Sequence, residues 1–589
     1  MQDSSLSHNG ARGTVLLKFK QNFMTGRHLR SGIAIAVLGW SLWPITSSAL
    51  HGDDIPNSMR SAVLEFTGES RWQSISSAVG QWLRNEGRFF PISAIENVYL
   101  FSTVRSVAVY KFIQWMILIC LVLVMTWFVR LLSGSNGILP VIAFGVVAAL
   151  QTRNWYDPTF GFGLLLQSVA LKLFLSAIFL HYCITGRRRL FWGASSLIIW
   201  TTALLQYEVV ITLFPILGVV ALISSTKRIS RRFVVVIPHL AISVLYFVIS
   251  QLLRDGKAVS PAYTTNTDLQ EVVPTYARQL SASIPFSAHI WNVTPATVIG
   301  ATSVVALAIF GSLGVLAAKA LSCNAEINSS RDHRIIGLFA IGINLIVGPG
   351  LPTSLSLRWQ AELSWGLGYL PVFLQYLGVA LVIVAVMLWF RTRTQAVVVQ
   401  RRILTLVVAL CAISATANRT LLIENVRAQE PARWSREFYE ASVRMGFFDH
   451  VAAGSIIESS VSDPNSWISD YFTLWLGGPN NLTFVKSGED RRSLCEVENC
   501  QNQSVFSLEP LNLTNSRQGL VLRERLVETN GQDTATEFTY SAQVRIVLPL
   551  GYPAPCRTNE PAVEGRSVSI FDCLDEPSIA LEAGMDSYD

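Results

Sequence analysis

Long apolar runs constrain the fold of this chain more than any other feature. Stretches of about 20 mostly apolar residues, the length that crosses a bilayer as a helix, recur from residue 31 to about residue 417. The 589-residue chain is only 15% charged, whereas soluble domains carry about 25% charged residues. The sequence therefore predicts a polytopic α-helical membrane protein. We expect eleven transmembrane helices, at roughly 31–50, 108–131, 138–151, 161–184, 191–206, 209–225, 233–252, 298–320, 335–350, 369–390 and 403–417.

Basic residues predict the orientation of these helices, because Lys and Arg favour cytoplasmic loops. Basic clusters precede the first helix and follow the fourth, sixth, eighth and tenth, and all of them fall on one side if the N-terminus is cytoplasmic. The net charge of +6 is thereby explained without a nucleic-acid partner. We expect an integral protein of the bacterial inner membrane, with its C-terminal part on the outer, periplasmic side.

The chain divides into three predicted parts: a cytoplasmic segment over 1–30, a transmembrane domain over 31–417 and an extracytoplasmic α+β domain over 418–589. The first outer loop, 51–107, is long and carries Trp72, Ile75 and Val79 at helical spacing, which predicts an amphipathic helix on the outer surface. In the tail, the alternating stretches "TEFTYSAQVRIVLPL" and "RSVSIFDC" predict strands.

The tail also holds an even set of cysteines, Cys495, Cys500, Cys556 and Cys573. Four cysteines in an exported domain indicate two disulfides in an oxidising compartment. Three pairings are possible, and proximity in the chain favours Cys495–Cys500 with Cys556–Cys573.

Charged and polar residues gather in the outer connections between helices, where a membrane protein needs a reason for them. Each has an ordinary interpretation as a solvated loop acid, a local ion pair or a tight turn. Their recurrence on one face, from several separate connections, indicates a site instead. The candidates are Asp53 and Asp54 in "HGDDIP", Arg88 in "EGRFFP", Arg153 and Asp157 in "TRNWYDP", Tyr207 and Glu208 in "LLQYEVV", and Arg358 and Gln360 in "SLRWQAELSWG".

Such a set suits transfer of a group from a lipid-linked phosphate donor at the membrane surface. Arginines bind the phosphate, and interfacial aromatic residues contact the isoprenoid stem. A carboxylate deprotonates the acceptor hydroxyl as a general base. The second acid of the pair has two further uses that the sequence leaves open: holding the acceptor, or binding a divalent cation such as Mg²⁺ or Mn²⁺.

The layout resembles the GT-C superfamily of membrane glycosyltransferases, in particular bacterial GT-C-like proteins of surface-polysaccharide assembly. The resemblance rests on the acidic pair in the first outer loop, followed by "GRFFP", "RNWYDPTFGFGLLLQ", "LLQYEVV" and "RWQAELSWGLGYLPVFLQY". It implies a hexosyl- or pentosyltransferase that takes its sugar from a polyprenyl-phosphate donor and passes it to a glycan, lipid or protein acceptor.

The resemblance also implies roles for individual residues. Asp53 or Asp54 would be the catalytic base, with Asp54 slightly preferred. Arg88, Arg153 and Arg358 would contact the donor phosphate or the acceptor, and Asp157 and Glu208 would orient them. The continuation "IPNSMR" after the acids departs from the aromatic-rich pattern of better-described members, which puts the exact base in question.

Two other functions compete with this interpretation. A polysaccharide polymerase or ligase would use Arg and His in large outer loops and would not need an acid after the first helix. Only His51 and His289 are histidines of the outer loops between helices. A transporter or flippase would place charges deep within its helices. Few charges lie deep within the predicted helices, and Lys172 and His239 are the exceptions. Lys172 either pairs with an acid or extends toward the surface, and His239 fits a hydrogen-bonded core position.

Overall fold

A computed structural model gives the fold of most of the membrane part and of several tail strands. It describes residues 26, 28–153, 157–224, 234–254, 264–291, 301–322, 330–392, 397–444, 454–459, 483–485, 505–513, 517–525, 538–545, 568–569, 582–583 and 585–587.

The N-terminal half of the described chain is helical. A first helix spans His28–Ser47 and ends in the 3-10 turn η1 (Trp43–Ser47). The following elements are α2 (Asp54–Ser58), α3 (Arg60–Thr67), α4 (Arg71–Gln81), the π-helical turn η2 (Trp82–Glu86), α5 (Pro91–Thr103), α6 (Val107–Ser133), α7 (Leu139–Ala149), α8 (Leu165–Thr185), α9 (Arg189–Leu204), the 3-10 helix η3 (Glu208–Leu213), α10 (Phe214–Ile223) and α12 (Ile237–Arg254).

Further helices follow, and then strands. The helices are α13 (Leu269–Ser281), α14 (Ser287–Ile290), α15 (Ala301–Ser322), α16 (Ser330–Val347), α17 (Gly350–Ser354), α18 (Leu357–Glu362), α19 (Val372–Thr392) and α20 (Val397–Arg444). The strands are β1 (Ile456–Ser459), β2 (Thr483–Val485), β3 (Val505–Leu513), β4 (Arg517–Arg525), β5 (Phe538–Arg545), β6 (Val568–Ser569), β7 (Glu582–Ala583) and β8 (Met585–Ser587).

The structure confirms the predicted class of polytopic helical membrane protein. In the described residues, seven helices are long and apolar enough to cross a membrane, and three more are apolar but shorter. Each of the eleven predicted ranges overlaps a helix, but the fifth, 191–206, corresponds to α9, which belongs to neither of these two sets. The seven long ones are His28–Ser47, Val107–Ser133, Leu165–Thr185, Ser303–Leu321, Asp332–Ser354, Val372–Phe390 and Arg401–Gln429, and the shorter ones are Leu139–Ala149, Glu208–Ile223 and Ile237–Leu253.

The last helix is much longer than predicted. Sequence hydropathy falls after residue 417, but α20 continues without a break to Arg444. Backbone hydrogen bonds do not depend on side-chain polarity, so an apolar helix can continue as a polar one. The domain boundary expected at 417 therefore falls inside a helix.

The chain forms two compact units. The membrane unit comprises Met1–Gly52, Ile75–Asn97 and Val109–Arg427, and the second unit comprises Asp53–Ser74, Val98–Ala108 and Ala428–Asp589. The second unit contains a six-stranded sheet of order β2-β1-β3-β4-β5-β8, in which β1 pairs in parallel with β2 and β3 and the remaining pairs are antiparallel. Strands β5 and β6 lie in the two stretches predicted to be strands, while the four tail cysteines lie outside the described residues.

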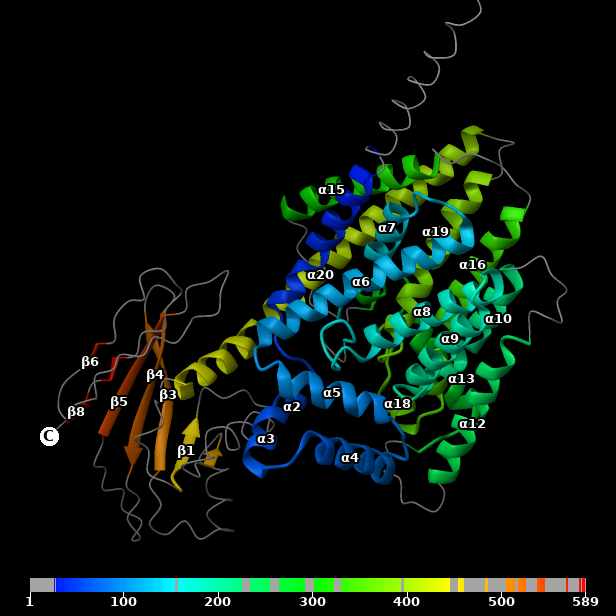
Figure 1. The fold of residues 1–589 in the computed structure, drawn as a ribbon. Helices are drawn as coiled ribbons and strands as arrows, with labels where there is room; N and C mark the ends of the chain where they lie inside the picture. The colour runs from blue at the N-terminus through cyan, green and yellow to red at the C-terminus, as the bar shows by residue number, and fades with distance from the viewer. Residues whose placement is uncertain are drawn as a thin grey trace, which may run out of the picture. The chain divides into compact units, whose positions relative to one another are not determined.

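The core of the membrane unit is built around α7. Ten of its eleven residues are buried, and it packs against α15 and α19, its neighbours in Figure 1. Helix α19 also packs against α16, and their backbones meet at two glycines. A Cβ atom on Gly342 would lie 2.9 Å from the carbonyl oxygen of Gly378, so neither position has room for a side chain. Small residues at such crossings are how membrane helices approach closely.

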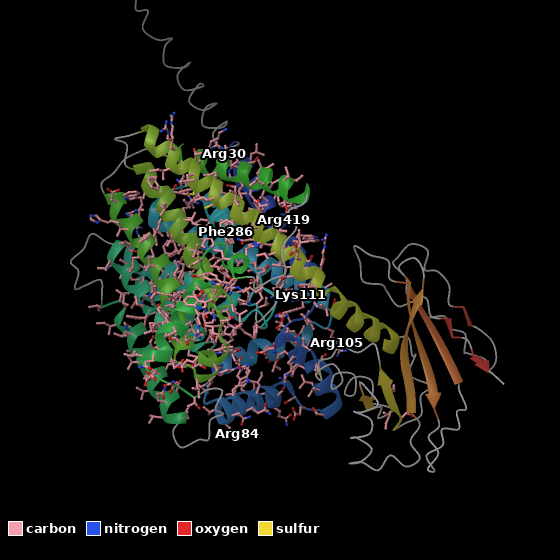
Figure 2. The ribbon with its side chains drawn as sticks, turned by 180° about the vertical axis from the view of Figure 1, so that it is seen from behind. Arg30, Arg84, Arg105, Lys111, Phe286 and Arg419 are labelled. Carbon is pink, nitrogen blue, oxygen red and sulfur yellow. The ribbon has the colours of Figure 1, made fainter. Side chains whose placement is uncertain are left out.

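Helix ends inside this unit are satisfied by side chains from other helices. Pro44 has no N–H, so the carbonyl of Trp40, four residues earlier, loses its helical donor. The guanidinium of Arg419 on α20, labelled in Figure 2, supplies one instead, at 3.0 Å from Trp40 O and 3.3 Å from Ser41 O. It also lies 3.6 Å from the centre of the Trp40 ring.

Two other helix ends repeat this arrangement. Asn418 Nδ2 donates to the carbonyls of Val147 and Ala148 at the end of α7, at 3.1 and 3.0 Å. Where "GPG" stops α16, Gln375 Nε2 donates to Ile346 O at 2.7 Å, and Tyr276 Oη donates to Val347 O at 2.9 Å. In surroundings with little water, an unsatisfied carbonyl is costly, so these side chains fix how the helices meet.

Both exceptional polar residues of the helices have partners. Lys172 forms an ion pair with Glu96 of α5 and donates to Ser168 and Gln206. His239 shares a 2.9 Å hydrogen bond between its Nε2 and Ser196 Oγ. Lys172 therefore pairs with an acid, the first of its two predicted alternatives.

Arg419 is expected to be a major stabilising residue. Arg419→Met should lower the unfolding temperature of the purified protein in detergent, because it leaves the partly buried Trp40 carbonyl without this donor, a loss of about 1 kcal/mol. Thermal unfolding is the measurement, and the exposed Arg402 of the same helix provides the control Arg402→Met. Equal losses in the two variants would contradict this role.

Candidate functional site

The membrane unit contains a cavity of about 360 Å³ between several of its helix connections and α12. It is formed by the segment before α5, the start of η3, α12, and the short helices α17 and α18. The residues that line it are Gly87, Arg88, Phe89, Phe90, Tyr207, Glu208, Val209, Ile211, Thr212, Tyr246, Phe247, Ser250, Gln251, Thr265, Leu351, Pro352, Thr353, Leu355, Ser356, Trp359 and Tyr369.

The motif "EGRFFP" presents Arg88 to this cavity. Gly87 has φ of 64°, a left-handed conformation that ends the preceding helical turn and suits glycine. The N–H of Arg88 closes this turn on Trp82 O at 3.2 Å, and Pro91 starts α5. Arg88 thus lies on a short linker that is fixed at both ends.

The motif "QYE" supplies the partner of Arg88. Tyr207 is extended, with φ of −158°, and Glu208 begins η3. Arg88 Nη2 lies 2.7 Å from Glu208 Oε1, an ion pair between segments 120 residues apart. The guanidinium also lies 4.4 Å from the centre of the Phe90 ring. Burial, together with the nearby Glu208 charge, raises the pKa of Tyr207, so its hydroxyl keeps its proton at neutral pH.

The rest of the cavity is aromatic and apolar. Trp359 and Tyr369 stack with ring centres 3.8 Å apart, and Tyr246 donates from its hydroxyl to Phe89 O at 3.2 Å. The lining residues Phe247 and Leu351 are 52% and 45% exposed. Among the described lining residues, Arg88 is the one cation and Glu208 the one anion, and the others are hydroxyl-bearing, aromatic or apolar for the most part. This composition suits an amphiphile with an anionic head.

The second predicted pair, Arg153 and Asp157, is buried and binds backbone. The Arg153 guanidinium donates to the carbonyls of Leu367 and Ala282. The Asp157 carboxylate accepts from the N–H groups of Arg153 and Thr159, at 2.5 and 2.6 Å. Burial raises the pKa of Asp157 to about 6 despite these hydrogen bonds. Neither residue lines the cavity; their predicted substrate and orienting roles stay predictions.

Arg358 and Gln360 flank the cavity residue Trp359 on α18. Arg358 Nε pairs with Glu362 Oε1 at 3.0 Å, and its guanidinium lies 4.7 Å from the centre of the Trp359 ring. Gln360 is buried. Its Oε1 accepts a hydrogen bond from Asn266 Nδ2, and its Nε2 donates to Ser354 O. Neither is a lining residue. Their contacts position α18, and direct contact with a substrate stays a prediction.

The acidic pair, Asp53 and Asp54, belongs to the second unit, whereas the residues that line the cavity belong to the membrane unit. Asp53 immediately precedes α2 and is exposed, whereas Asp54 begins α2 and is fully buried. The predicted outer-loop helix forms as α4, with Ile75 buried and Trp72 66% exposed. Nothing in these positions ranks one acid over the other as a base, and both stay candidates.

His51, two residues before Asp53, lies near a buried lysine of the membrane unit. Lys111 at the start of α6 is fully buried and donates to the carbonyl of Phe160 and to Gln114. Burial and the Lys111 charge lower the pKa of His51 to about 4. His51 is therefore neutral at physiological pH and carries no charge toward a substrate.

No group of three or more His, Cys, Asp or Glu side chains that could hold a metal occurs within the described part of the chain. A divalent cation on Asp53 and Asp54 stays a prediction. Two carboxylates from adjacent residues, one exposed and one buried, do not by themselves complete the six or more oxygen ligands that such ions take.

The sequence predicts three of the cavity residues as site residues, Arg88, Tyr207 and Glu208, and misses six aromatic ones: Phe89, Phe90, Tyr246, Phe247, Trp359 and Tyr369. Trp359 and Tyr369 lie inside the motif "RWQAELSWGLGYLPVFLQY", but an interfacial aromatic residue also has an ordinary explanation as a membrane anchor. Tyr246 lies in an apolar helix, and its hydroxyl, which needs a hydrogen-bond partner when buried, is the one feature of the sequence that points to a polar contact there.

No protein-family model and no curated protein sequence matches this chain. Two solved structures are similar to it, both of ArnT from Cupriavidus metallidurans. The one bound to undecaprenyl phosphate is 15% identical and has a TM-score of 0.31, covering 82% of this chain and 92% of that chain. The apo one is 16% identical, with a TM-score of 0.30 and coverage of 85% and 93%.

Asp157 should make stability depend on pH. Its pKa of about 6 in the folded state lies above the ordinary value of 3.8, so the folded protein keeps a proton that the unfolded chain releases. Stability should therefore fall by about 3 kcal/mol as pH rises from about 4 to about 6, and stay level above that. The unfolding temperature of the wild type should therefore decrease between about pH 4 and about pH 6. The unfolding temperature of Asp157→Asn should decrease less over the same range. An unchanged slope would contradict the assignment.

Proposed function

We propose that this protein is a membrane glycosyltransferase. It transfers a hexose or pentose from a polyprenyl-phosphate donor to a hydroxyl group of a glycan, lipid or protein acceptor on the outer face of the bacterial inner membrane. The observation that carries the proposal is the cavity, in which a single guanidinium lies among aromatic and apolar walls beside a membrane helix.

The cavity supports the donor half of the reaction. Arg88 is held on a fixed linker and partly buried, so it can donate two parallel hydrogen bonds to a phosphate. The exposed apolar residues Phe247, Leu351 and Leu355 at the cavity suit the first isoprene units of the lipid. A soluble nucleotide sugar would require polar walls in their place.

The acceptor half of the proposal assigns the base to Asp53 or Asp54. The carboxylate removes the proton of the acceptor hydroxyl as its oxygen attacks the anomeric carbon. The bond between that carbon and the phosphate oxygen breaks, and its electron pair leaves with the polyprenyl phosphate. Atoms and charge balance without a redox partner, and the proton balance requires no metal.

Arg88 is the first residue to test. Arg88→Gln should weaken binding of farnesyl phosphate to the purified protein about tenfold or more, because a charge-assisted hydrogen bond to the phosphate is lost. Binding can be followed by the tryptophan fluorescence of the full-length chain. The matched control is Arg84→Gln, an exposed residue four positions earlier that is labelled in Figure 2. Equal affinity of Arg88→Gln and the wild type would contradict the proposed donor site.

The acidic pair is tested by loss of transfer. Asp53→Asn or Asp54→Asn should slow release of undecaprenyl phosphate from undecaprenyl-phosphate-linked hexoses and pentoses by about 100-fold or more. Membrane insertion and farnesyl phosphate binding should stay unchanged. Full activity of both single variants and of the double variant would rule out an acid of the first outer loop as the base.

A further inference from the structure

The two charges in the cavity are in direct contact with each other. Arg88 is the one cation and Glu208 the one anion among the described lining residues, and 2.7 Å separates their charged groups. No hydrogen bond reaches the second carboxylate oxygen, Glu208 Oε2, from the described part of the chain, although this oxygen is shielded from solvent. Any phosphate that Arg88 binds therefore lies next to a carboxylate that has one free acceptor oxygen.

Substrate and product of the proposed reaction differ in charge. A polyprenyl-phosphate sugar is a phosphodiester with one negative charge. The polyprenyl phosphate that remains after transfer is a phosphomonoester, whose second pKa of about 6 gives it close to two charges at pH 7 and above.

The neighbouring carboxylate penalises the second charge more than the first. Repulsion between like charges grows with the charge on the phosphate, and the apolar walls of the cavity strengthen it relative to water. Arg88 alone would favour the monoester, because a dianion attracts a guanidinium more strongly. The presence of Glu208 opposes that preference.

We propose that Glu208 is a specificity-determining residue that disfavours the phosphomonoester product relative to the phosphodiester donor. This inference rests on the proposed function and extends it: the same site that binds the donor through Arg88 expels the spent carrier through Glu208. The carboxylate thereby limits product inhibition by the polyprenyl phosphate that remains in the membrane.

A purely structural role for Glu208 makes a different prediction. If the carboxylate only positions Arg88, Glu208→Gln keeps an oxygen acceptor of the same shape for the guanidinium. The affinities for monoester and diester would then stay equal to the wild-type values or fall together. The ratio of the two affinities separates the roles.

The experiment compares two probes on the full-length protein in detergent at pH 8. Farnesyl phosphate represents the monoester and methyl farnesyl phosphate the diester, and tryptophan fluorescence reports their binding. Glu208→Gln should tighten binding of farnesyl phosphate by roughly fivefold or more, the factor that one like-charge contact at about 4 Å contributes even in water, and should tighten diester binding less. The control Glu271→Gln changes the same charge at an exposed position of α13 outside the cavity lining and should leave both affinities unchanged.

Each outcome has a defined meaning. Selective tightening of the monoester supports the inference. Equal changes for both probes, or no change, overturn it and leave the proposed function intact if Arg88→Gln weakens both probes. Binding of farnesol as tight as that of farnesyl phosphate, with no effect of Arg88→Gln, overturns the proposed donor site and this inference together.

Discussion

Satisfying backbone carbonyls at broken helix ends is the constraint on which the membrane unit depends. Several of its helices end within the packed interior, and each end leaves carbonyls without a helical donor, as Pro44 does for Trp40. Arg419, Asn418, Gln375 and Tyr276 supply donors from other helices. Each of these bonds joins two helices at one point, so the polar side chains determine the assembly while apolar burial supplies the general driving force.

The same constraint explains why the polar residues predicted as site residues have two different roles. Arg153 appears in the sequence as a candidate phosphate ligand, yet its guanidinium donates to two carbonyls from distant segments. Gln360 likewise donates to the carbonyl of Ser354 and accepts from the side-chain amide of Asn266. Arg88 differs because its carboxylate partner lies in a cavity with room for another molecule. Arg153 and Arg88 are both arginines outside the helices, so residue type and local position do not separate them, and only their surroundings do.

The cavity draws on segments that are far apart in the chain. "EGRFFP" and "QYE" meet because α5 begins beside the end of α9, where Ile92 N–H donates to Leu205 O at 3.2 Å. Both motifs carry local signals, a glycine and a proline in one and an extended tyrosine before a 3-10 helix in the other. These local signals determine the conformation of each turn. The packing of the helices determines that the two turns lie next to each other.

The sequence by itself determined the class of the protein, the places of its helices and the three charged or phenolic residues of the cavity. Hydrophobic length and turn chemistry are local properties, so they can be read along the chain. Only the tertiary structure decided that α20 continues to Arg444, that Tyr246, Trp359 and Tyr369 join the cavity, and that Arg153 and Asp157 bind backbone. The physical reason is that a polar side chain takes its role from the donors and acceptors around it, and in this protein those come from residues up to several hundred positions away.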